Sequence, residues 1–173
     1  MKKRLFITFL VLIVALFTIY RISVKAPSGN YPLQNKATAI FIKGGCLSCH
    51  SANPDLPFYA DLPVIGNMVK NDSKEGYRMF DMTPMMTALE NGILPSPVDV
   101  AKVEKVTLDG TMPPAQYYLV HWGSEMTSTK RDIIIEWVTD YREEYYADGL
   151  QGERAGEPIR PIPLTVAVDA RKA

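Results

Sequence analysis

The stretch Gly44-Gly-Cys-Leu-Ser-Cys-His50 contains both cysteines of this 173-residue chain. A disulfide between Cys46 and Cys49 would close a very short loop and would stabilise the fold little. A zinc site takes four ligands, and His121 is the only histidine left besides His50. A thioredoxin-like redox pair belongs to a βαβ unit, which the hydrophobic pattern lacks. The two thiols therefore need another explanation.

Two thiols three residues apart, followed at once by a histidine, form the attachment signature of haem c. Each thiol can add to one vinyl group of the macrocycle, so Cys46 and Cys49 predict two thioether links. The imidazole of His50 then reaches the iron as the proximal ligand. The sequence thus predicts one covalently bound haem c.

The sixth iron ligand has to be chosen among eight methionines by their local setting. Met112 lies in Gly110-Thr-Met-Pro-Pro114, where two prolines stiffen a loop without helical periodicity. Such a loop can present a thioether to a flat cofactor, although a methionine can also just fill a gap beneath a loop. Met85 and Met86 follow a helical stripe and are expected in the core. We therefore predict Met112 as sixth ligand and keep His121 as the alternative.

The N-terminal segment predicts export with or without retention in the membrane. Residues 1–4 carry three positive charges, and Leu5 to Ile19 carries none. This run is short for a spanning helix of about 20 residues and long for a signal-peptide core of about 7–15. Pro27 directly after Ala26 disfavours cleavage, so we expect residues 1–26 to stay as a membrane anchor. The alternative is a cleaved signal and a soluble periplasmic protein; the anchored form would face the periplasm from the bacterial inner membrane.

The rest of the chain predicts an all-α domain with long loops. A linker is expected over 27–34, a haem domain over 35–148 and a Pro-rich tail over 149–173. Residues 51–67 are expected to form a loop with at most one helical turn, and the polar segment 71–81 is expected to break at Gly76. Helices are expected over Lys36–Gly44 with Asn35 as cap, from a Thr83 cap to Asn91-Gly92, over Pro97–Val106, and from Thr127 or Ser128 to Asp148-Gly149.

Charge and site chemistry favour electron transfer over catalysis. The chain has 19 basic and 19 acidic residues, so no basic excess points to nucleic acid. A small haem peroxidase would need an open iron position and an acid–base residue, and His121 is the one candidate, without an obvious partner. A haem-based sensor with a displaceable Met112 is the other alternative. We expect an electron-transfer protein rather than an enzyme.

Further stretches carry a family likeness: His50–Pro54 (HSANP), Pro57–Pro63 (PFYADLP), Glu75–Asp81 (EGYRMFD), Met112–His121 (MPPAQYYLVH) and Ile134–Trp137 (IIEW). Together they resemble the haem-binding domain family of bacterial c-type cytochromes over about residues 35–145. The resemblance implies a single haem c, an all-α cytochrome-like fold and electron transfer in the periplasm. It supports Met112 as distal ligand, while His121 matches the family's pattern too.

The tail has a second likeness, over Glu157-Pro-Ile-Arg-Pro-Ile-Pro-Leu and onward to Ala173. It is similar to the segment that leads into the dihaem domains of bacterial cytochrome c peroxidases. This resemblance implies a redox partner, either a dihaem cytochrome c peroxidase or a similar periplasmic oxidoreductase. Because the sequence has one CxxCH motif, we expect no peroxidase activity from this chain.

Overall fold

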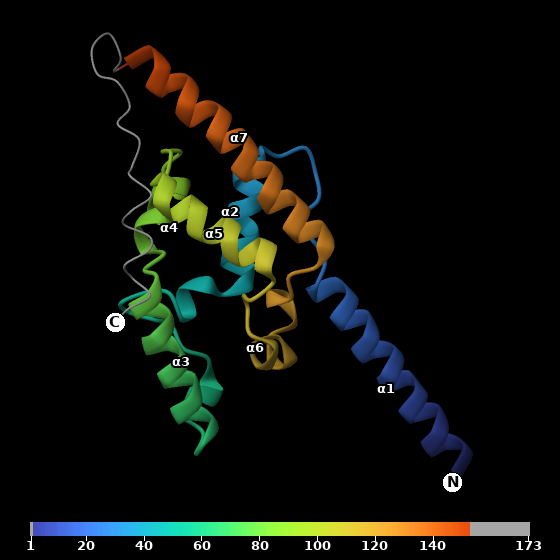
Figure 1. The fold of residues 1–173 in the computed structure, drawn as a ribbon. Helices are drawn as coiled ribbons and strands as arrows, with labels where there is room; N and C mark the ends of the chain where they lie inside the picture. Colours follow the sequence, from blue (N-terminus) through green and yellow to red (C-terminus); the bar gives the residue numbers. More distant parts are fainter. Residues whose placement is uncertain (1, 153–173) are drawn as a thin grey trace. The chain divides into compact units, whose positions relative to one another are not determined.

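The computed structural model describes residues 2–152, and every regular element in that range is helical (Figure 1). The prediction of an all-α fold is therefore confirmed. By contacts the chain divides into two units, Met1–Tyr141 and Arg142–Ala173, and the first holds the candidate site. The elements are α1 (Lys2–Ser23), α2 (Leu33–Gly44), the 3₁₀ turn η1 (Cys46–Ser48), η2 (Phe58–Asp61), α3 (Ile65–Met79), α4 (Thr83–Glu90), α5 (Pro97–Asp109), α6 (Ala115–Val120), η3 (Trp122–Ser124) and α7 (Ser128–Gly152).

The hydrophobic core is formed by α2, α4, α5 and the first half of α7. Met85 and Met86 of α4 are buried, as their helical spacing predicts. Phe41 of α2 meets Trp137 of α7 edge to face with ring centroids 5.8 Å apart, a favoured aromatic geometry. The Tyr141 hydroxyl donates to the Pro95 carbonyl at 2.8 Å, so its polar tip is satisfied inside the core.

Several predicted helix boundaries are wrong by a few residues. α2 begins at Leu33, and Asn35 lies inside it rather than capping it, because the Lys36 amide already bonds to the Pro32 carbonyl at 3.2 Å. α5 continues to Asp109, where Gly110 ends it with φ 64°, a left-handed value that glycine adopts freely. α7 runs to Gly152 rather than ending at Asp148-Gly149.

At two further helix starts a side-chain oxygen accepts a backbone amide. Thr83 is the first residue of α4 instead of its cap, and the Asp81 carboxylate accepts the Thr83 amide at 2.9 Å. At α7 the predicted cap is correct, since the Thr127 hydroxyl accepts the Lys130 amide at 3.4 Å.

The largest correction concerns residues 65–79. η2 supplies the single turn expected before them, but α3 then runs unbroken through Gly76. A Cβ at Gly76 would lie 2.7 Å from the Cys49 carbonyl oxygen, closer than ordinary contacts allow. The glycine is therefore used for a close approach between backbones, not for a helix break.

α1 is long and apolar enough to cross a membrane, with a mean hydropathy of 2.5 and no buried residue. A signal sequence near an N-terminus has the same character, so this helix fits both interpretations of the N-terminal segment. Its last turn contacts the haem domain: the Tyr20 hydroxyl donates to Glu125 Oε2 at 2.7 Å, and the Tyr20 ring meets that of Trp122 at 6.0 Å.

Candidate haem-binding site

The CxxCH motif lies on one tight turn that begins where α2 ends. Gly45 has φ 67°, which stops α2 in the left-handed conformation and turns the chain into η1. The Cys46 carbonyl then accepts the amides of Cys49 at 3.2 Å and His50 at 2.9 Å. Both cysteines are free and partly accessible, so the turn offers two thiols and one imidazole from five consecutive residues.

The surroundings of both thiols disfavour the thiolate form. Burial raises the pKa of Cys46 to about 12. Burial also raises the pKa of Cys49, and the Asp72 carboxylate adds to that rise. Redox-active and metal-binding cysteines have a lowered pKa, because the thiolate is the reactive form. Among residues 2–152 no cluster of three or more His, Cys, Asp or Glu side chains is placed to hold a metal ion.

His50 is held in an orientation suited to an iron ligand. Its Nδ1 lies 2.9 Å from the Phe80 carbonyl oxygen, which can only accept, so Nδ1 carries the proton. In the neutral imidazole this tautomer leaves the lone pair on Nε2, the form in which histidine binds a metal. The backbone is fixed as well, because the His50 carbonyl accepts the Met82 amide at 2.8 Å. The residues present thus fit a haem whose iron is bound from the His50 side.

α3 packs against the CxxCH turn. This contact was not predicted from the sequence. Ser73, buried in α3, donates its hydroxyl to the Ser48 carbonyl at 3.1 Å. One turn further on, Gly76 lies against the backbone of Cys49. The sequence did contain a signal for this contact: Gly76 stands alone in a polar run that is compatible with a helix. A glycine in such a run can end the helix, but it can also allow a close approach of another backbone.

His121, the alternative ligand, lies in an aromatic cluster with Tyr59 and Tyr117. Its Nδ1 is 2.6 Å from the Tyr59 hydroxyl, and its ring stacks on Tyr117 with centroids 4.7 Å apart. Burial lowers the pKa of His121, which favours the neutral imidazole. The expectation that His121 has no obvious partner is therefore wrong: a residue of η2, 62 positions away, supplies one.

The cluster adjoins the attachment turn. A Cβ on Gly45 would lie 2.5 Å from the Tyr117 hydroxyl oxygen. That hydroxyl is buried, and the Ser48 side chain is the polar group beside it, although not at ordinary hydrogen-bond geometry in the part of the chain that the structure describes. Burial raises the pKa of Tyr117 to about 12, an effect that the nearby Ser48 side chain partly opposes.

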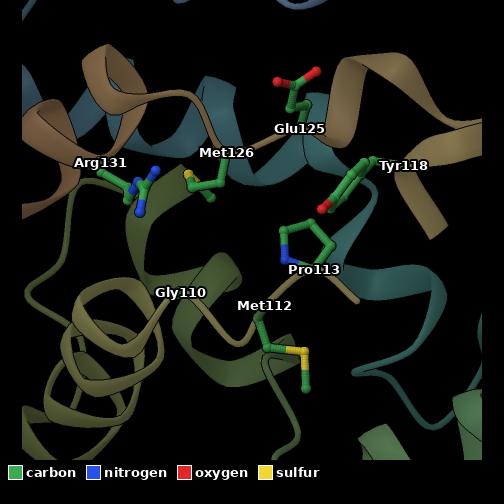
Figure 2. A pocket seen from close by; sticks show the side chains of 7 residues that line it. All are labelled: Gly110, Met112, Pro113, Tyr118, Glu125, Met126 and Arg131. Carbon is green, nitrogen blue, oxygen red and sulfur yellow. The ribbon is translucent and has the colours of Figure 1, made fainter. Parts of the chain in front are cut away.

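Met112 is carried by the loop between α5 and α6, as its setting predicts. The peptide bond before Pro113 is cis, and the Met112 side chain is 39% exposed, so it is not a core-filling methionine. A pocket of about 210 Å³ lies at the base of this loop and is lined by Gly110, Met112, Pro113, Tyr118, Glu125, Met126 and Arg131. Figure 2 shows the Met112 thioether pointing away from Met126 and Arg131. The roles of Cys46, Cys49, His50 and Met112 as haem ligands stay predictions.

A helical domain around a thiol pair and an oriented histidine defines a haem-binding protein of the cytochrome type. Comparison with protein families agrees: residues 10–140 match the haem-binding domain, and the chain belongs to that family of c-type cytochromes. It is similar to the cytochrome c peroxidase Ccp of Escherichia coli (strain K12), with 33% identity over 139 residues. The match covers 80% of this chain but 30% of that relative. No solved structure matches significantly.

Two predictions are not decided by the structure or by the family match. The tail from Glu157 to Ala173, with its likeness to a peroxidase lead-in, lies beyond residue 152. The predicted limits of the haem domain, 35 and 148, are not decided by the match to residues 10–140, which also includes much of α1.

Proposed function

We propose that this chain is a mono-haem c-type cytochrome that transfers electrons in the periplasm. Thioether links from Cys46 and Cys49 would hold the haem, and His50 and Met112 would bind its iron. The observation that carries the proposal is the orientation of His50, whose Nδ1 is fixed by the Phe80 carbonyl at 2.9 Å directly after the two thiols. Membership of the haem-binding family supports the cofactor.

A bound haem would supply a one-electron redox couple. The residues of this chain would orient the haem and set its reduction potential. The Phe80 carbonyl keeps His50 in one tautomer and makes it a stronger donor. α3 keeps the attachment turn in place through Ser73 and Gly76. Met112, brought by the loop after α5, would close the sixth position and raise the reduction potential. With His50 and Met112 both holding the iron, the haem would serve outer-sphere electron transfer.

We further propose that α1 stays on the protein as a membrane anchor. Tyr20 donates to Glu125, and the Lys25 carbonyl accepts Lys43 Nζ at 3.2 Å. Cleavage after Ala26 would remove both contacts from the haem domain. An anchor of this kind would keep the cytochrome next to membrane-bound electron sources.

The partner we propose is a dihaem cytochrome c peroxidase or a similar periplasmic oxidoreductase. The Escherichia coli relative is named a cytochrome c peroxidase, and it is more than three times as long as the part that matches this chain. A likeness to one part of a peroxidase supports a peroxidase as the partner. A short-lived redox contact needs only a small interface, below about 1,200 Å². The balanced charge of the chain predicts weak long-range attraction, so partner binding should depend little on salt.

The attachment is tested by staining denatured protein on a gel for haem. Cys46→Ala combined with Cys49→Ala should lose the stain, whereas Ser48→Ala, a change within the same turn, should keep it. Stain that survives in the double variant would contradict covalent attachment.

The transfer role is tested by mixing the reduced protein with a dihaem peroxidase from the same cell and adding hydrogen peroxide. Oxidation of this haem at a rate comparable to peroxidase turnover is the expected result. Oxidation no faster than in the peroxidase-free control would refute the proposed partner.

A small haem peroxidase is the second candidate, because the structure gives His121 a partner. His121 accepts a hydrogen bond from Tyr59 or donates one to it, as an acid–base residue does, and burial lowers the pKa of His121, which favours the neutral imidazole. This function requires an open iron position, so peroxide turnover by the isolated chain, abolished in His121→Ala, would favour it over electron transfer.

A further inference from the structure

Five large apolar side chains are exposed on one short stretch, around η2 and the beginning of α3. We refer to this stretch, residues 58–68, as the apolar tip. Phe58 is 85% exposed and Val64 82% exposed. The others are Leu62, Ile65 and Met68. Exposed apolar clusters of this kind mark surfaces that another apolar phase or partner covers.

The apolar tip is firmly built rather than a loose loop. Ala60 at its centre is buried, and a Cβ on Gly66 would collide with the Ala60 carbonyl, so η2 and α3 pack backbone to backbone. Val64 has φ 68°, a left-handed value that is strained for a β-branched residue. A glycine would relieve that strain but would remove an exposed apolar side chain. The backbone thus holds Val64 outward at an energetic cost.

The same unit of the structure carries a helix of membrane-spanning length. Tyr20 of α1 donates to Glu125 at 2.7 Å and contacts Trp122, so the end of α1 is docked on the domain that bears the tip. The connection between Ser23 and Leu33 spans at most about 35 Å even if fully extended. A retained α1 therefore keeps this domain at the surface of the bilayer.

The charges beside the apolar tip suit a lipid interface. Asp61 is the one charged residue among residues 58–68, and its carboxylate lies 3.5 Å from Lys70 Nζ, so the net charge on and beside the tip is small. Phe, Leu, Ile and Val side chains are those that enter the boundary between headgroups and acyl chains.

We propose that the apolar tip inserts into the outer leaflet of the membrane that α1 spans, giving the haem domain a second contact with the bilayer. The phospholipid acyl boundary is thus the partner of this surface. The inference rests on the proposed retention of α1. It would restrict the tumbling of the haem domain and hold the haem site at one orientation to the membrane.

The test uses the full chain in nanodiscs that contain a phospholipid with a photoactivatable diazirine on its acyl chain. After illumination, lipid adducts are mapped by peptide mass spectrometry. We expect adducts on α1 and, several-fold above background, on residues 58–68. α5 provides the matched control, because Val98 and Leu108 are exposed apolar residues on a helix too.

A double variant, Phe58→Ser with Val64→Ser, should lose the adducts on the tip and keep those on α1, with an unchanged haem spectrum as evidence of folding. Adducts on α1 with no more on the tip than on α5 would overturn this inference and leave the anchor standing. No adducts on α1, together with a mature N-terminus at Pro27, would overturn the anchor and with it the inference.

Discussion

Gly76→Ala tests whether α3 must approach the attachment turn as closely as the structure shows. The added Cβ would lie 2.7 Å from the Cys49 carbonyl oxygen and 3.2 Å from the Cys49 Cβ, against 3.4 Å for the start of ordinary contact. The obstacle is backbone, which cannot rotate away as a side chain could. Overpacking of this type costs about 1–3 kcal/mol. Alanine returns up to about 1 kcal/mol through its better helix propensity.

We expect a net loss of about 1–2 kcal/mol in the free energy of unfolding, measured by denaturant titration of the haem-loaded protein. The haem content per chain should fall as well, because α3 must move away from Cys49. Gly44→Ala is the matched control: that glycine is also helical and near the motif, but its Cβ would meet Cys46 Sγ at an ordinary 3.6 Å. If Gly76→Ala were as stable and as fully loaded as Gly44→Ala, the supporting role of α3 would be wrong.

Two further substitutions test buried residues, and a third prediction concerns the retention of α1. Met85→Ala should cost about 2–5 kcal/mol of stability without altering the haem spectrum, because Met85 is 1% exposed and lies in the core; a changed spectrum would place it at the iron. Lys130→Met should lower the unfolding free energy by about 2 kcal/mol, since the buried ammonium donates to two backbone carbonyls near η3, both at 2.8 Å; an unchanged denaturation midpoint would show that these bonds are redundant. The mature protein should include residues 1–26 and stay with membranes in an alkaline wash, and a mature N-terminus at Pro27 would contradict this.

The helical class and the core were predictable because they depend on local periodicity. Met85 and Met86 lie on the apolar side of a short predicted helix, so their burial follows from spacing alone. The attachment motif is equally local, since five consecutive residues hold both thiols and the histidine.

What the sequence did not predict depends on contacts between distant residues. The hydrogen bond between Tyr59 and His121 joins residues 62 positions apart, and no pattern in either segment predicts it. Gly76 was interpreted as a break because local propensity disfavours glycine in helices, whereas its close packing on Cys49 decides its role. The carbonyl that orients His50 comes from Phe80, 30 residues further on.

The absorption spectrum of the purified full chain, oxidised and reduced, tests the central claim most directly. Ligation by His50 and Met112 predicts a six-coordinate, low-spin haem in both states. Met112→Ala should make the oxidised haem partly high-spin and lower its reduction potential, because the thioether stabilises the reduced iron. A high-spin, five-coordinate spectrum in the unaltered protein, or an identical spectrum in Met112→Ala, would contradict Met112 as the sixth ligand.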